Sequence, residues 1–69
     1  NASIDDLQHK SMLLEVTFTD GATYEYFGIN KNLFSKLINA DKMQRFARRN
    51  IYNSFTYRKS KRTLEAEQN

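Results

Sequence analysis

Hydrophobic and polar residues alternate in two runs near the start of the chain, and Asp20-Gly21 separates the two runs. Apolar or aromatic side chains occupy every second position in these runs, at Leu14, Val16, Phe18, Tyr24 and Tyr26. A period of two is typical of a β-strand with one buried face. Asp-Gly is a strong turn signal, because glycine adopts a positive φ without steric cost. The pattern therefore predicts a β-hairpin over residues 12–27.

The length of the turn decides which way the two tyrosines face. A two-residue loop would pair Val16 with Glu25 and place this carboxylate on the apolar face, which costs several kcal/mol or forces it to become neutral. A three-residue loop over residues 19–21 pairs Val16 with Tyr24 instead and turns both tyrosines inward. It also sets Glu15 opposite Glu25, a like-charge pair that costs roughly 0.2–1 kcal/mol. Because the second penalty is the smaller one, we favour the three-residue loop.

Two segments with helical periodicity follow the hairpin. Residues 31–40 carry one apolar stripe, and Asn30 is a suitable N-cap for them. Asp41 precedes a second helix over residues 42–52, and with Gln44 it forms a capping-box-like D-x-x-Q pattern. At 100° per residue, one arc of this helix holds Met43, Phe46, Ala47, Asn50 and Ile51. The opposite arc holds Lys42, Arg45, Arg48, Arg49 and Tyr52.

The hairpin needs a further strand or a covering helix, because an isolated hairpin is only marginally stable in water. Residues 3–10 are an edge strand or an extended arm, and residues 55–58 are a second candidate strand. These elements predict an α+β fold, a small antiparallel β-meander of two or three strands packed by two short helices. The single domain covers residues 3–58. Residues 59–69, first basic and then acidic, are expected to be a flexible or weakly helical tail.

The composition narrows the classes of function. The 69 residues are enough for one domain and include no cysteine, so we expect a cytoplasmic protein without disulfides. No apolar run reaches the roughly 20 residues that a membrane span requires, so no membrane partner is expected. The chain has no glycine-rich phosphate loop, and Asp5, Asp6 and His9 are too few for a metal centre. We therefore expect no catalytic site, no metal and no cofactor, and hence no enzyme.

Charge is distributed unevenly along the chain. Residues 1–30 contain five acidic residues and one basic residue, whereas residues 31–62 contain ten basic residues and one acidic residue. Such asymmetry suggests an acidic partner, most commonly nucleic acid. We expect phosphate contacts, with an unpaired base stacked on the tyrosine, at Lys42, Arg45, Arg48, Arg49, Tyr52, Arg58, Lys59, Lys61 and Arg62. An ordinary solvated surface explains the same pattern about equally well, and both interpretations stay open.

One run of residues resembles a known family, the KTSC domain, and this run is Phe18-x-Asp20-Gly21-x-x-Tyr24-x-Tyr26-Phe27-Gly28-Ile29. The KTSC domain is a short module found at the C-terminus of some lysyl-tRNA synthetases and as a single-domain bacterial or phage protein. Its later pattern is similar to Phe46, Arg48-Arg49-Asn50-Ile51 and Phe55, so the resemblance covers residues 3–58. The function of this family is unassigned, and an RNA-binding role has been suggested for it. Together with the basic arc, the resemblance leads us to expect a non-enzymatic module that binds nucleic acid, in particular RNA. The alternative is a protein-interaction module of phage or prophage origin that docks on an acidic partner surface.

Overall fold

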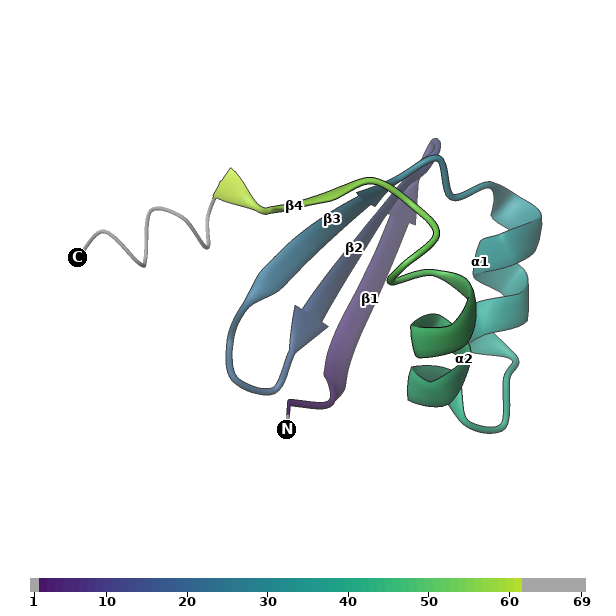
Figure 1. The fold of residues 1–69 in the computed structure, drawn as a ribbon, viewed down its shortest axis with the longest axis horizontal. Coiled ribbons are helices and arrows are strands. Elements are labelled where there is room, and N and C mark those ends of the chain that lie inside the picture. The colour runs from purple at the N-terminus through teal and green to yellow at the C-terminus, as the bar shows by residue number, and fades with distance from the viewer. Residues whose placement is uncertain (1, 62–69) are drawn as a thin grey trace.

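The computed structural model describes residues 2–61 and consists of one sheet and two helices (Figure 1). The elements are β1 (Ile4–Lys10), β2 (Leu13–Phe18), β3 (Thr23–Phe27), α1 (Lys31–Ile38), α2 (Met43–Asn50) and β4 (Tyr57–Lys59). The strands form one antiparallel sheet in the order β1-β2-β3-β4. The α+β class is thus confirmed. The expected two or three strands are too few, because both candidate segments join the sheet.

The hairpin between β2 and β3 has the three-residue loop. Val16 pairs with Tyr24, and the Phe18 N–H donates to the carbonyl oxygen of Ala22 at 2.8 Å. Gly21 adopts a φ of 92°, a conformation that other residues reach only with strain. Tyr26 is only 5% exposed. The inward orientation of the tyrosines is therefore confirmed.

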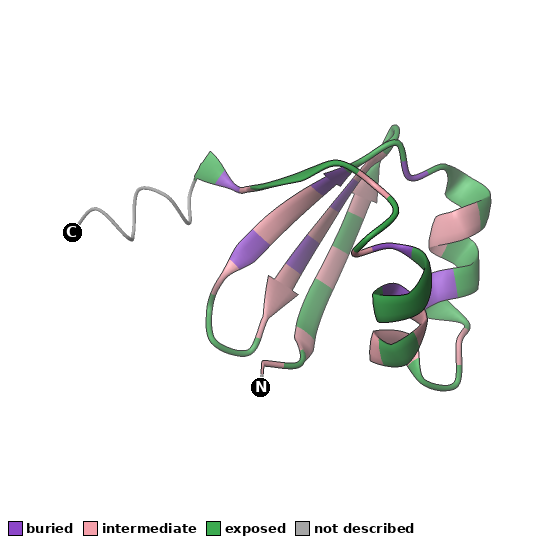
Figure 2. Ribbon diagram, in the orientation of Figure 1, coloured by how far each residue is buried: buried purple, intermediate pink, exposed green. Residues whose placement is uncertain are grey.

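The core lies between the helices and one face of the sheet, and its buried residues are marked in Figure 2. The members of the core are Leu14, Val16, Tyr26, Ile29, Leu37, Ala47 and Ile51. A fully buried leucine or isoleucine contributes about 1.5–3 kcal/mol by leaving water. The helices leave the opposite sheet face, which we call the open sheet face, to polar side chains such as Glu15, Thr17 and Glu25.

The two helices begin differently, and only one of them begins as the sequence predicts. The Asn30 side-chain oxygen accepts a hydrogen bond from the Leu33 N–H at 2.8 Å, which confirms the cap of α1. The predicted capping box of α2 is wrong, because the residue before the helix is Lys42 and no side chain caps it. Gln44 instead accepts a hydrogen bond from the Ile4 N–H at 3.0 Å. This contact joins α2 to β1.

The end of α2 also corrects the predicted helical arcs. The helix ends at Asn50 rather than at residue 52. Asn50 is exposed instead of facing the core, and its side-chain amide donates to the Phe46 carbonyl oxygen at 3.0 Å.

The first residues of the expected tail are part of the fold. Lys59 lies in β4, and the Ser60 N–H donates to the Thr23 carbonyl oxygen at 2.9 Å. Residues 62–69 of the expected tail lie outside the described residues.

Candidate nucleic-acid interface

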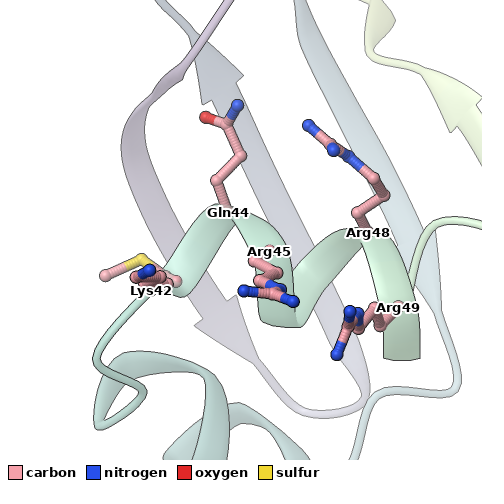
Figure 3. A pocket seen from close by; sticks show the side chains of 6 residues that line it. Lys42, Gln44, Arg45, Arg48 and Arg49 are labelled. Carbon is pink, nitrogen blue, oxygen red and sulfur yellow. The ribbon is translucent and has the colours of Figure 1, made fainter.

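The outer side of α2 carries a set of cations that we call the basic face, consisting of Lys42, Arg45, Arg48 and Arg49. The helical period creates this set, because the buried Ala47 and the half-buried Met43 and Phe46 turn the apolar arc toward the core. All four cations are exposed. Figure 3 shows Arg45 and Arg49 on one side of the helix and Arg48 on another side together with Gln44, whose side chain contacts β1.

The basic face surrounds an open hollow of about 650 Å³. Its lining consists of Lys42, Met43, Gln44, Arg45, Arg48 and Arg49. Within residues 2–61, none of the four cations forms an ion pair with a carboxylate. The first turn of α2 contains no acidic residue, and Asp41 precedes the cap residue Lys42. The hollow is therefore a site of concentrated positive charge, suited to an anionic ligand.

The structure separates the other predicted basic residues from the basic face. Arg58 lies on the open sheet face, where its Nε donates to a Glu25 carboxylate oxygen at 2.7 Å and its guanidinium covers the Phe27 ring at 5.3 Å. Lys61 borders a second hollow together with Asp6 and other polar residues of the open sheet face. Lys59 is half-buried in β4, and Arg62 lies outside the described residues.

Tyr52 lies near Arg48, as expected, but its ring is half-buried rather than exposed. The α-helix ends before this residue, and the ring turns inward to stack on Tyr26 at a centroid distance of 5.5 Å. The Tyr52 hydroxyl oxygen is buried and forms no hydrogen bond within the described part of the chain. Burial raises the pKa of this hydroxyl, and the nearby positive charge of Arg48 partly lowers it again. Tyr52 is thus a partner of the core rings, and its role as a base-stacking residue stays a prediction.

Sequence reasoning missed a different tyrosine, Tyr57 in β4, which is 55% exposed. Its ring contacts Tyr24 at a centroid distance of 5.9 Å and Tyr26 at 5.4 Å. The alternation of Phe55 and Tyr57 with polar residues places both side chains on the inner face of a strand. This alternation could not show that the helices do not extend over β4 and therefore leave Tyr57 exposed (Figure 1).

The described residues do not gather ligands for a metal ion. No group of three His, Cys, Asp or Glu side chains among them is arranged to hold one. His9 packs instead on Phe34 with a centroid distance of 4.7 Å, and its Nε2 donates to the Ile29 carbonyl oxygen at 2.6 Å. None of the described helices is long and apolar enough to cross a membrane.

Comparison with known protein families identifies a match that covers most of the elements described above. The family model described as KTSC domain matches residues 6–57. A comparison with curated proteins finds no match. The matched region begins in β1, includes both helices and the basic face, and ends on Tyr57, the first residue of β4. Because the match spans well over half of the sequence, the chain belongs to the KTSC domain family.

Proposed function

We propose that this protein is a non-enzymatic RNA-binding module whose basic face contacts phosphates. The observation that carries the proposal is the gathering of four exposed cations around one hollow, without a carboxylate partner in the described residues. Guanidinium groups match the geometry of phosphate oxygens, and three of the four cations are arginines. A nucleic-acid backbone supplies the matching row of closely spaced negative charges.

The choice of RNA rather than DNA rests on the resemblance to the C-terminal module of some lysyl-tRNA synthetases. The fold itself supports nucleic acid in general, because phosphate contacts carry no information about the sugar or the base. An RNA ligand would place the working protein in the cytoplasm, which agrees with the absence of cysteine.

A salt-dependent titration tests the proposal. Four phosphate contacts on a single strand predict a log–log slope of affinity against salt of roughly −3. Arg45→Ala/Arg49→Ala removes two of these contacts, so the slope should become shallower by about 1.4 and affinity at low salt should fall about tenfold. Fluorescence anisotropy with a labelled single-stranded RNA measures both quantities.

The matched control is Lys31→Ala/Lys36→Ala, which removes two exposed charges from α1 instead of α2. The net charge of the two double variants is equal, so a general loss of positive charge would weaken both alike. We expect the α1 variant to retain most of the affinity. Equal weakening of both variants, or no RNA binding at low salt, would contradict the proposal. Binding of polyglutamate in the absence of RNA binding would favour an adaptor that docks on an acidic protein.

A further inference from the structure

Five aromatic rings form a continuous cluster that runs from the core to the surface. This aromatic cluster consists of Phe18, Tyr24, Tyr26, Tyr52 and Tyr57. Tyr52 and Tyr26 stack at an interplanar angle of 24°, and Tyr26 continues to Tyr57 at 31°. The cluster therefore begins at Tyr52, just after the end of α2, and ends at Tyr57 in the edge strand β4.

The surface end of the cluster offers one open aromatic face. Tyr26 covers one side of the Tyr57 ring, and Tyr24 meets this ring at 70°. Because the Tyr57 side chain is still 55% exposed, its other side faces solvent. The arrangement in Figure 1 explains this exposure, because the helices lie toward the β1 side of the sheet and β4 forms the opposite edge. A ring held by two neighbours loses little entropy when a ligand stacks on it.

The aromatic cluster also adjoins the basic face. Figure 3 shows Arg48 on the same side of α2 as Gln44, which contacts β1, and on a different side from Arg45 and Arg49. Arg48 is close enough to Tyr52 for its charge to lower the pKa of the tyrosine hydroxyl. From Tyr52, two ring-to-ring distances of 5.5 and 5.4 Å lead to Tyr57. The basic face and the exposed Tyr57 ring thus lie toward the two ends of one aromatic cluster, and a single strand with a phosphate on Arg48 would follow this cluster to bring a base over Tyr57.

We propose that Tyr57, supported by Tyr24 and Tyr26, is a stacking site for an unpaired base, and that the ligand is single-stranded RNA. This inference rests on the proposed function, since it adds a base site to the phosphate contacts of the basic face. Bases inside an A-form duplex are already stacked on one another, so only an unpaired base can present a free face. Stacking on an aromatic side chain tolerates any base, so the site would select strandedness rather than sequence.

The test compares three RNA ligands of equal length: a single strand, the same strand with abasic sites, and a duplex. Tyr57→Leu should weaken binding of the intact single strand roughly tenfold. The same change should leave binding of the abasic strand, binding of the duplex and the salt slope unchanged, because all phosphate contacts remain. Tyr57→Phe should bind like the unsubstituted protein, because the ring rather than the hydroxyl group carries the stacking.

The matched control is Phe27→Leu, which removes another exposed aromatic ring. Phe27 alternates with Tyr26 in β3 and lies beneath Arg58, so its ring is on the open sheet face, away from the basic face. We expect this variant to bind every ligand normally. A 2-aminopurine base in the single strand should also lose fluorescence on binding the unsubstituted protein, a readout that needs no variant.

The failure of this inference can be told apart from the failure of the proposed function. If Arg45→Ala/Arg49→Ala weakens binding but Tyr57→Leu does not, and 2-aminopurine stays bright, the stacking site is wrong while the phosphate contacts stand. Equal affinity for abasic and intact strands would overturn the stacking site in the same way. If no RNA binds at low salt, the proposed function fails and the stacking site fails with it.

Discussion

The Tyr26 hydroxyl belongs to the most buried of the four tyrosines. The pKa of this hydroxyl is raised from 10 to about 12, chiefly by burial and to a lesser extent by the neighbouring Tyr52, Tyr57 and Tyr24. The cause is physical, because a phenolate inside an aromatic cluster loses its hydration and gains no cation. The fold therefore holds Tyr26 in its neutral form at pH values where an unfolded chain would ionise it.

This shift makes stability depend on pH in the alkaline range. Between pH 10 and 12 the unfolded chain releases the Tyr26 proton while the folded protein retains it. The unfolded state then binds fewer protons, so the free energy of unfolding falls as the pH rises, by roughly 2–3 kcal/mol over the whole window. The stability that depends on a neutral Tyr26 is fully present below pH 10 and is lost by about pH 12.

Tyr26→Phe tests this account, because phenylalanine has no titrating group. Urea unfolding followed by circular dichroism at pH 9, 10 and 11 should show a smaller decline in stability for the variant than for the unsubstituted protein. The comparison uses the slope against pH, so a constant offset from the substitution has no influence. Parallel declines would show that Tyr26 ionises alike in the folded and unfolded states.

The beginnings of the helices show what local sequence patterns can and cannot predict. Asn30 and Asp41 are both good cap residues by type, yet only Asn30 caps a helix. The D-x-x-Q pattern is local, whereas the partner of Gln44 is the Ile4 N–H, forty positions away in the chain. A sequence pattern contains no information about such a distant donor, so the competition between the two contacts could not be foreseen.

The caps give a paired prediction about stability. Asn30→Ala removes the hydrogen bond to the Leu33 N–H, so it should lower the free energy of unfolding by about 1 kcal/mol. Asp41→Ala removes no cap, and we expect a change within about 0.5 kcal/mol. Thermal or urea unfolding of the two variants measures the difference. A loss from Asp41→Ala as large as that from Asn30→Ala would contradict the assignment of the caps.

The register of the hairpin strands could be predicted in more detail than the ends of the helices. Burying the Glu25 carboxylate costs more free energy than setting it opposite Glu15, so one register is clearly favoured. That penalty alone favoured the register in which Val16 pairs with Tyr24, and this register is present. The same register sets Glu15 opposite Glu25, as expected. The sequence could not show that Arg58 of β4 lies across from Glu25 and supplies a positive charge at 2.7 Å.

The charge asymmetry of the sequence becomes a separation between two surfaces of the molecule. Acidic residues of the first half, including Asp6, Glu15 and Glu25, line a hollow on the open sheet face. The cations of α2 form the basic face instead. Arg58 and Lys61 offset part of the negative charge on the open sheet face, so an anionic ligand would be attracted more strongly to the basic face.

Which basic residues share a surface depends on long-range folding. The helical period predicted the exposure of the three arginines of α2 correctly, because they occupy a single helix, and Lys42 directly precedes that helix. Arg58 and Tyr52 could not be placed in the same way. Their orientation depends on the end of α2 at Asn50 and on the return of the chain to the sheet as β4. The exposure of Tyr57 depends on the same return, so the aromatic end of the candidate site emerged only from the structure.

Mapping the RNA contact by NMR tests the central claim, that the basic face is the binding surface. The ¹⁵N-labelled protein would be titrated at low salt with a single-stranded RNA, and amide chemical shifts would be followed. We predict the largest changes over residues 42–49 and at Tyr57, with reversal as salt is added. Largest changes on the open sheet face around Glu15 and Glu25 or along α1, or no changes at all, would contradict the claim.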